Sequence, residues 1–412
     1  MTQRIRPLSG VRIADFTWVG VGPLGMKHLA DAGAEVIKIE TTQRPDTLRR
    51  AGPMVEGADG YERSAHFYNL NTSKIGVTLN LNTEKGRDLA LRVIAASDLV
   101  AESFTTRVME KWRLTYDDIR QVKPDIIMLS ASMEGRTGPH KNYLGFGTAL
   151  QSSVGITWQM GWPDRGPESP GTAYTDWVVP YFVATASLAA LEYHRRTGKG
   201  QWIDISQMEA GVHTLDSALL DYSVNGRSWS RVGNALISGN LPRAVHHGVY
   251  RCRGEDRWVA IAVFSDEEWR TLVRLVGSPA WATDPALATL LGRIERVEEI
   301  ERGLEAWTRN QDAEWIMHTF QKAGLNAGVV QNQRDVANDP QLQHRGHSHW
   351  VDHLDIGVQL YDGPSYRLPK SPSALAPVPV LGQDNEHVFR NIVGLSEEEY
   401  AACWEAGAFE VA

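Results

Sequence analysis

The sequence predicts an α/β fold, in which a Rossmann-like parallel sheet is covered by helices on both faces and is joined to a smaller α+β domain. Three observations lead to this prediction. β-branched, apolar segments alternate with helical segments over residues 11–132, which is typical of a parallel sheet. A change of composition near residue 225 separates this pattern from a second one. The 412 residues also exceed one ordinary core, so we expect two domains, at most three.

The first part of the chain supplies the strands of this sheet. Residues 11–16 are β-branched and apolar and predict a strand, a helix is expected over 24–31 behind Pro23, and a second strand follows at 36–39. The alternation then recurs, with extended, helical, extended, helical and extended segments expected at 74–81, 84–96, 99–102, 116–121 and 125–132. Such repetition predicts successive βαβ units in one sheet.

A stretch rich in Gly, Ser, Trp and Pro interrupts the pattern at 141–175. Irregular segments of this length are usually functional or disordered, and the aromatic side chains here favour a packed, functional loop. A strong helix is expected over 177–196, with Thr197 and Gly198 at its end. A strand at 201–205 and a helix at 208–222 follow.

The second half of the chain predicts where the domains divide. Residues 225–240 are rich in Gly, Ser, Asn and Arg, as linkers are. Beyond them we expect two β-segments and then helices, at 247–263, 266–275, 296–309 and 312–323, and a closing strand and helix at 350–353 and 396–406. We therefore assign the large Rossmann-like domain, the linker, the small domain and the return to the large domain to residues 1–224, 225–238, 239–335 and 336–412.

Composition and charge exclude several classes of function. A net charge of −8 and a pI near 5.9 argue against a nucleic-acid partner, so an anionic ligand needs a local cluster of Lys, Arg or backbone amides. Two cysteines, Cys252 and Cys403, form no disulfide framework and suit a reducing cytoplasm. The longest strongly apolar uncharged run, 177–191, is too short to cross a membrane and contains Pro180. We expect a soluble cytoplasmic protein.

The segment from Gly20 to Gly25 matches the dinucleotide-binding pattern G-x-G-x-x-G, with Glu40 twenty residues beyond its first glycine. A helix N-terminus there would offer free amides and a positive dipole end to a pyrophosphate. The alternative is a mononucleotide-type βαβ unit whose glycines only tighten the turn. Residues 17–19 make this loop longer than a tight dinucleotide turn, which favours the alternative.

Asp176 stands between an irregular Gly/Pro segment and a long apolar helix. One interpretation is a helix N-cap, for which aspartate is among the preferred residues. The other is a nucleophile, because a helix N-terminus also favours an ionised, available carboxylate.

No metal site is predicted. The histidines at 344, 347, 349 and 353 lack a cysteine or carboxylate that would complete a metal-ligand spacing, and solvated loop histidines are the expectation. The sequence contains no G-x-S-x-G elbow, P-loop or H-E-x-x-H motif.

Several segments, in the right order, resemble class III CoA-transferases, the CaiB/BaiF family. They are PLSGVRIADFTWVGVGP, NLNTSKIGVTLNLNTEKGRDL, SASMEGRTGP, DWVVPYFVATASLAALEYHRRTGKGQWIDISQMEA, HHGVYRCRGEDRWVAIAV and NDPQLQHRG. The resemblance implies an interlocked homodimer with a Rossmann-like large domain in each chain, a heteromer remaining open. It also disfavours the dinucleotide interpretation, since Gly22 and Pro23 belong to the family signature whereas Gly20 and Gly25 are not characteristic of it.

The resemblance implies that Asp176 is the catalytic nucleophile, which takes part in covalent transfer of CoA from an acyl-CoA to a carboxylic acid. Coenzyme A and acyl-CoA are then substrates, and no tightly bound cofactor is expected. The residues implied to contact CoA are Trp18, Gly20, Val21, Lys74, Ser103, Phe104 and Lys111. Thr41 stands where formyl-CoA transferase has an arginine, so Arg49, with Arg50, is expected to supply that charge.

The loop expected over the active site departs from the family pattern. Leu236, Ile237, Ser238, Gly239 and Asn240 replace a run of four glycines and a glutamine. This bulkier loop, with Phe146, Trp158 and Trp162 expected near the acyl group, favours an acceptor larger than oxalate. We expect a dicarboxylate carrying an aromatic or branched group, such as benzylsuccinate, with succinyl-CoA as the donor.

Two alternatives stay open from the sequence. An acyl-CoA racemase of the same family needs a histidine where this chain has Phe146, flanked by Gly145 and Gly147, and phenylalanine cannot carry a proton. A non-catalytic acyl-CoA-binding subunit of a heteromeric transferase would not need Asp176. Transfer between two carboxylates of one molecule is also compatible with the sequence.

Overall fold

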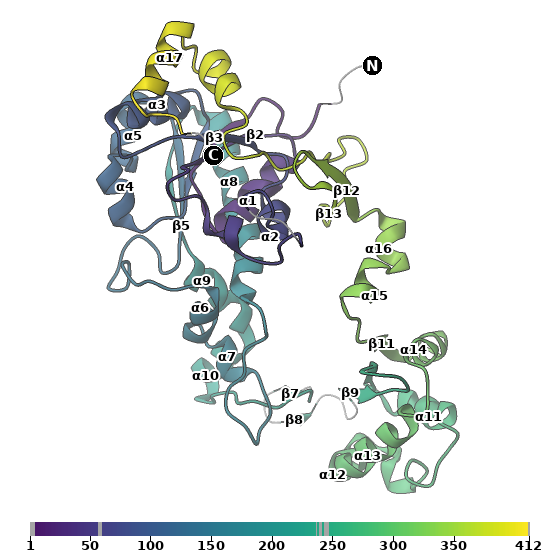
Figure 1. Cartoon of the computed structure of the whole chain (residues 1–412). Coiled ribbons are helices and arrows are strands. Elements are labelled where there is room, and N and C mark those ends of the chain that lie inside the picture. Colours follow the sequence, from purple (N-terminus) through teal and green to yellow (C-terminus); the bar gives the residue numbers. More distant parts are fainter. Residues whose placement is uncertain (1–4, 57–59, 236, 239–240, 243–246, 411–412) are drawn as a thin grey trace. The chain divides into compact units, whose positions relative to one another are not determined.

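The structure is a computed structural model that describes residues 5–56, 60–235, 237–238, 241–242 and 247–410 (Figure 1). The chain forms two compact units. Unit 1 comprises Met1–Ile156, Pro170–Leu215 and Pro340–Ala412. Unit 2 comprises Thr157–Ser169 and Asp216–Asp339.

A six-stranded parallel sheet forms the centre of unit 1, in the order β3-β2-β1-β4-β5-β6. In chain order its strands are Arg12–Asp15, Glu35–Glu40, Ile75–Thr78, Leu99–Glu102, Ile127–Ser132 and Trp202–Ser206. This order is that of a doubly wound Rossmann-like sheet, in which the order of the strands reverses between β1 and β4 while all strands stay parallel. The predicted α/β fold class is confirmed.

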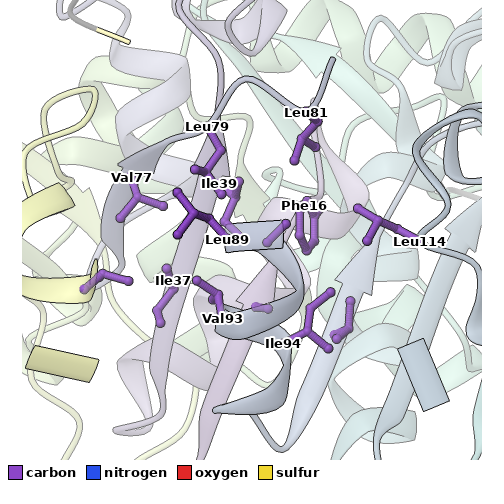
Figure 2. Close-up of a cluster of buried hydrophobic side chains, with 14 of the residues drawn as sticks. Phe16, Ile37, Ile39, Val77, Leu79, Leu81, Leu89, Val93, Ile94 and Leu114 are labelled. Carbon is purple, nitrogen blue, oxygen red and sulfur yellow. The ribbon is translucent and has the colours of Figure 1, made fainter. Parts of the chain in front are cut away.

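Helices cover both faces of the sheet, because successive strand residues point to opposite sides. On one face, Ile13 and Leu129 pack against α1 (Val21–Asp31) and α8 (Tyr174–Thr197). On the other face, Leu89, Val93 and Ile94 of α3 pack on strand residues such as Ile37, Ile39 and Val77 (Figure 2). α3 spans Glu84–Ala95, and α5 (Tyr116–Val122) and α17 (Glu397–Glu405) join the same face.

The remaining elements of unit 1 are short. The helices α2, α4, α6, α9 and α16 span Ala65–Leu70, Thr106–Trp112, Gly147–Ser153, Gln207–Val212 and Pro340–Arg345. A hairpin of β12 (Ser348–His353) and β13 (Gly357–Asp362) packs Tyr361 against Phe67 and Tyr68 of α2. In the described part of the chain, no helix is both long and apolar enough to cross a membrane.

Unit 2 has its own core of helices packed on a small antiparallel sheet. The sheet order is β11-β10-β9, from strands Asn326–Val329, Trp258–Ala262 and His247–Arg251. The helices α10 to α15 span Asp216–Asn225, Asp266–Leu275, Leu290–Glu295, Val297–Thr308, Ala313–Lys322 and Gln333–Ala337. The short strands β7 and β8 pair Ile237–Ser238 with Leu241–Pro242, and α7 (Ile156–Gln159) lies where the two units divide.

The helix expected from about 177 to 196 is confirmed as α8, which begins three residues earlier, at Tyr174. The segment 141–175, expected to be irregular, contains the short helices α6 and α7, and the expectation of one helix over 208–222 was wrong. The backbone amide of Tyr174 donates to Oε1 of Gln151 on α6 (2.9 Å), so a tertiary contact satisfies the helix start in place of a side-chain cap. The helix expected over 208–222 breaks after α9, where Thr214 Oγ1 donates to the carbonyl of Gly211 (2.7 Å) and competes with the helical hydrogen bond.

Candidate active site

A cavity of about 590 Å³ lies at the carboxyl edge of the parallel sheet. Residues that follow every one of the six strands line it: Trp18, Thr41, Leu79, Ser103, Met133 and Gln207. Its centre is the switch point between β1 and β4, where open α/β sheets bind their ligands. There Ser103 Oγ accepts from the amide of Trp18 (2.8 Å) and donates to its carbonyl (3.2 Å), which joins the two loops.

Asp176 lies in the first turn of α8, and its side chain lines this cavity. Nε2 of Gln207, the first residue of α9, donates to Oδ1 of Asp176. Burial raises the pKa of the Asp176 carboxyl, while the Gln207 hydrogen bond and the charge of His66 oppose that rise. The result is a partly desolvated carboxylate held in one orientation by a neutral donor.

Two glycines lie beside the Asp176 side chain, and one of them leaves the space that its carboxylate occupies. A Cβ added at Gly147, the first residue of α6, would lie 2.5 Å from Oδ1 and 2.6 Å from Cγ of Asp176. A Cβ added at Gly20 would lie 3.5 Å from the Asp176 Cβ, which is ordinary contact. The space that a side chain at residue 147 would need is therefore occupied by the carboxylate, and only glycine fits there without displacing it.

Most of the predicted site residues lie together. Trp18, Gly20, Val21, Ser103, Phe104, Lys111 and Phe146 line the same cavity as Asp176. Trp18 and Phe104 stack edge to face with ring centroids 5.3 Å apart, and Phe104 stacks in the same way on Trp112 at 5.2 Å. The cavity thus combines an aromatic wall with a carboxylate, and no histidine is among the described residues that line it.

The expectation that Arg49 and Lys74 would line the site is not met. The Arg49 guanidinium is fully buried, pairs with Glu40 and Glu62 at 2.8 Å each, and stacks on Phe67. These two carboxylates neutralise the Arg49 charge inside unit 1. Burial alone would raise the pKa of Glu40, but the charge of Arg49 lowers it to about 2, so Glu40 stays ionised and paired with Arg49. A buried Glu40 held this way is unsuited to a ribose hydroxyl, which further disfavours the dinucleotide interpretation.

Lys74 is also buried in the fold and does not line the cavity. Its Nζ donates to Asp15 Oδ2 and Asn71 Oδ1 at 2.8 Å each, and burial lowers its pKa to about 8. The sequence shows which residues carry charge but not which of them are neutralised by partners far along the chain. Arg50 is exposed and contacts Tyr61 outside the cavity.

Arg44, which the sequence analysis missed, supplies a cation at the cavity. It is exposed in the loop after β2, and Lys111 in the last turn of α4 lines the same cavity. Lys111 Nζ contacts Asn82 Oδ1 at 3.4 Å. The usable signal was position, because Arg44 follows the carboxyl end of β2 and Gln207 directly follows that of β6. Both ends contribute to the same edge of a parallel sheet.

The loop predicted to cover the site is only partly described. Ser238 lies in β7, paired with Leu241, and belongs to unit 2, whereas Gly239 and Asn240 lie outside the described residues. Trp158 and Trp162 also belong to unit 2, and their place near the acyl group stays a prediction. Phe146 does line it, with 70% of its surface exposed.

Among the described residues, no group of three His, Cys, Asp or Glu side chains could hold a metal ion. His353 differs from the expected solvated loop histidine. It is buried, with its ring centroid 4.5 Å from that of Tyr68, and Nδ1 accepts from the amide of Asp355 (3.1 Å).

Comparison with known proteins agrees with this architecture. Residues 8–385 match the model of CoA-transferase family III. The chain is 30% identical over 398 residues to succinyl-CoA–D-citramalate CoA-transferase of Chloroflexus aurantiacus, covering 96% of each chain. It is 30% identical over 402 residues to succinate–glutarate CoA-transferase of Agrobacterium fabrum, covering 95% of this chain and 97% of that one.

A crystal structure of a CAIB/BAIF family protein from Brucella suis superposes with a TM-score of 0.85 at 28% identity, over 94% of this chain and 99% of that one. The family match spans the parallel sheet, the helix α8 that carries Asp176, and the segments that form unit 2. The chain therefore belongs to CoA-transferase family III, and it is a class III CoA-transferase.

Proposed function

We propose that this enzyme transfers CoA from succinyl-CoA to a dicarboxylic acid through a covalent intermediate on Asp176. The observation that carries the proposal is the placement of Asp176: a partly buried carboxylate at the switch point of the sheet, inside a cavity with an aromatic wall and two cations. The donor and the acceptor class follow the names of the relatives, which act on succinyl-CoA or succinate with citramalate or glutarate.

The proposed reaction proceeds by successive acyl transfers. The Asp176 carboxylate attacks the thioester carbonyl of succinyl-CoA, and the C–S bond breaks to give a mixed anhydride and the CoA thiolate. The thiolate attacks the aspartyl carbonyl, which releases succinate and leaves an Asp176–CoA thioester. The acceptor carboxylate then attacks this thioester, and the thiolate released attacks the acceptor carbonyl of the new anhydride. The products are the new acyl-CoA and a regenerated carboxylate.

The surroundings of Asp176 suit such a nucleophile. Gln207 is a neutral donor, so it orients the carboxylate and leaves its charge in place. A salt bridge to Arg or Lys would instead neutralise the carboxylate. Burial raises the pKa, and a partly desolvated carboxylate is a stronger nucleophile than a solvated one. Phe146 stands at the position where a racemase needs a histidine, and it cannot carry the proton that this histidine would move at the acyl α-carbon.

The test is to trap the intermediate. The enzyme is incubated with a panel of acyl-CoAs, quenched with hydroxylamine, and examined by intact-protein and peptide mass spectrometry. We expect a hydroxamate on Asp176 with succinyl-CoA, and none in Asp176→Asn. The exposed Asp117→Asn serves as the control and should be modified at Asp176 like the wild type.

The pH dependence adds a second readout. Since burial raises the pKa of Asp176, the acylation rate should fall as the pH drops through a value above the usual aspartate range. Acyl-CoA binding without any modification would instead support the non-catalytic subunit, and exchange of the substrate α-proton would support the racemase.

We further propose that the enzyme is a homodimer that acts in the cytoplasm. The compartment is inferred from the cysteines, because buried free thiols at Cys252 and Cys403 suit a reducing environment.

The dimer is inferred from α8, which exposes between 38% and 53% of the surfaces of Trp177, Tyr181, Phe182 and Leu188. This is more apolar area than one helix normally leaves in water. Sedimentation of the purified chain should give twice the monomer mass, and a monomer would favour a heteromer with another chain.

A further inference from the structure

The loop from Thr17 to Gly20 joins β1 to α1 and carries residues that line the cavity, but one of them has an unusual backbone. Val19 has φ +66°, in the left-handed region that β-branched residues rarely adopt. Among the described residues, five that are not glycine have a positive φ, and Val19 is the one β-branched member. Such a conformation persists only when surrounding contacts hold it.

Those contacts come from Asp46. The amide of Val19 donates to both carboxylate oxygens of Asp46 at 3.2 Å. Asp46 is fully buried, and its Oδ1 also accepts from the amide of Leu48 (3.0 Å). Both oxygens are therefore committed, and the carboxylate itself is held in place by the turn that follows β2.

Lys38 connects this carboxylate to the other end of the loop. Its Nζ, also fully buried, donates to Asp46 Oδ2 (3.3 Å) and to the carbonyl of Thr17 (2.9 Å). Lys38 and Asp46 do not line the cavity, whereas Trp18, Val19 and Gly20 do. The pair thus acts on the cavity through the backbone of the loop, and the amide of Asp46 also donates to Oε1 of Glu40 (3.1 Å), which lines it.

The left-handed turn at Val19 determines where Gly20 lies. Gly20 is the N-cap of α1, and a Cβ there would be 3.5 Å from the Cβ and 3.6 Å from Oδ2 of Asp176. If Val19 relaxed to a negative φ, Gly20 would move away from Asp176, and the position of Trp18 in the cavity wall would change.

We propose that Lys38 and Asp46 are positioning residues, which hold Val19 in its left-handed conformation and so place Trp18 and Gly20 against acyl-CoA and Asp176. This inference rests on the proposed function. It assigns neither residue a contact with substrate or with the reacting atoms.

The test compares Asp46→Asn with the wild type in acyl-CoA KM and in the rate of Asp176 acylation. Asparagine offers one acceptor oxygen where the carboxylate offers two, so the hold on Val19 weakens. We expect KM to rise and the acylation rate to fall, together by roughly tenfold or more in kcat/KM, as for release of a strained residue.

The V19G background separates positioning from general destabilisation. Glycine adopts φ +66° without penalty, so D46N should cost much less kcat/KM when combined with V19G than alone. Equal losses in both backgrounds would overturn the inference. Val19→Pro, which imposes a negative φ and removes the amide donor without touching the buried charges, should reproduce the D46N defect. A V19P enzyme with wild-type kcat/KM would overturn it as well.

The matched control is Asp31→Asn. It breaks another buried ion pair of unit 1, to Lys27 (2.6 Å), away from the loop. This variant should lose thermal stability while keeping KM, so an equal rise in KM would contradict a specific role of Asp46. A wild-type enzyme that is not acylated at Asp176 would refute the proposed function instead, which keeps the two failures distinct.

Discussion

Gly147 shows how closely single residues control the candidate nucleophile. The Asp176 carboxylate occupies the space that a side chain at residue 147 would need. The side-chain amide nitrogen of Gln207 donates a hydrogen bond to the same carboxylate. Gly147 is not one of the described glycines that have a positive φ. Its role is therefore to leave space and not to permit an unusual backbone conformation. The chemistry of Asp176 therefore depends on the absence of a side chain at a neighbouring position.

Gly147→Ala should sharply reduce transfer. The new Cβ would lie 2.5 Å from Oδ1 of Asp176 and force the carboxylate to move. Since alanine favours the helix more than glycine does, α6 should remain folded. We expect kcat to fall roughly 100-fold, as for a misplaced reacting group, with little change in acyl-CoA binding, measured by steady-state kinetics and calorimetry.

Gly20→Ala is the graded comparison for this prediction. Its Cβ would meet Asp176 at 3.5 Å, an ordinary contact distance, so a smaller loss is expected than for Gly147→Ala. Equal losses in the two variants would show that the space around the carboxylate is not what limits transfer.

At the scale of helices and strands, the loop after β2 and the last turn of α4 each bring one cation to the cavity. Arg44 and Lys111 are exposed and line it, whereas Arg49 and Lys74 are neutralised inside the fold. Acyl-CoA carries phosphates distant from its thioester, so these cations are suited to binding the substrate rather than to the reaction itself.

The double variant Arg44→Gln/Lys111→Gln should raise KM for acyl-CoA by roughly three- to tenfold, because exposed ion pairs contribute modestly. kcat should stay near the wild-type value, since the lost contacts are equal in the ground and transition states. Kinetics in increasing salt should show a weaker salt dependence than in the wild type. Arg120→Gln, on an exposed site of α5, is the control, and a similar KM shift there would refute the assignment.

The helices and strands also show which parts of the fold can be predicted from sequence patterns. The strand at 99–102 and the helix at 266–275 were predicted with their observed bounds, since apolar patterning and flanking residues decide them locally. The start of α8 was missed because Gln151, 23 residues earlier in the chain, satisfies the amide of Tyr174. Which arginine would be free was also missed, because Arg49 pairs with Glu62, outside its own turn.

At the scale of the whole molecule, one half-buried histidine links stability to pH. His28 of α1 stacks on Tyr181 of α8 at 5.0 Å between centroids, and its Nε2 has no partner among the described residues. Burial, together with the charge of Lys27, lowers the pKa of His28 from 6.5 to about 4, and Asp31 opposes this only in part. The folded state therefore holds this ring neutral.

The sign of the effect follows directly. Protonation favours the unfolded state, so the contribution of neutral His28 is complete above pH 6.5 and is lost as the pH falls from 6.5 toward 4, by about 1.4 kcal/mol per pH unit. His28→Phe should make the free energy of unfolding, measured by denaturant titration, less dependent on pH in this range. The exposed His387→Gln should keep the wild-type slope. An unchanged slope in H28F would contradict the prediction.

The sequence by itself determined the α/β class, the identity of the segments that match the family, and Asp176 as the candidate nucleophile. Apolar periodicity is a local property, and the family's motifs are contiguous segments, so both can be recognised along the chain. The tertiary structure decided which charges remain available, how Gly147 and Gln207 enclose Asp176, and how Asp46 holds Val19. These depend on contacts between residues 9 to 59 positions apart in the chain. Burial and pairing arise only when the strands assemble and bring their carboxyl ends to one edge.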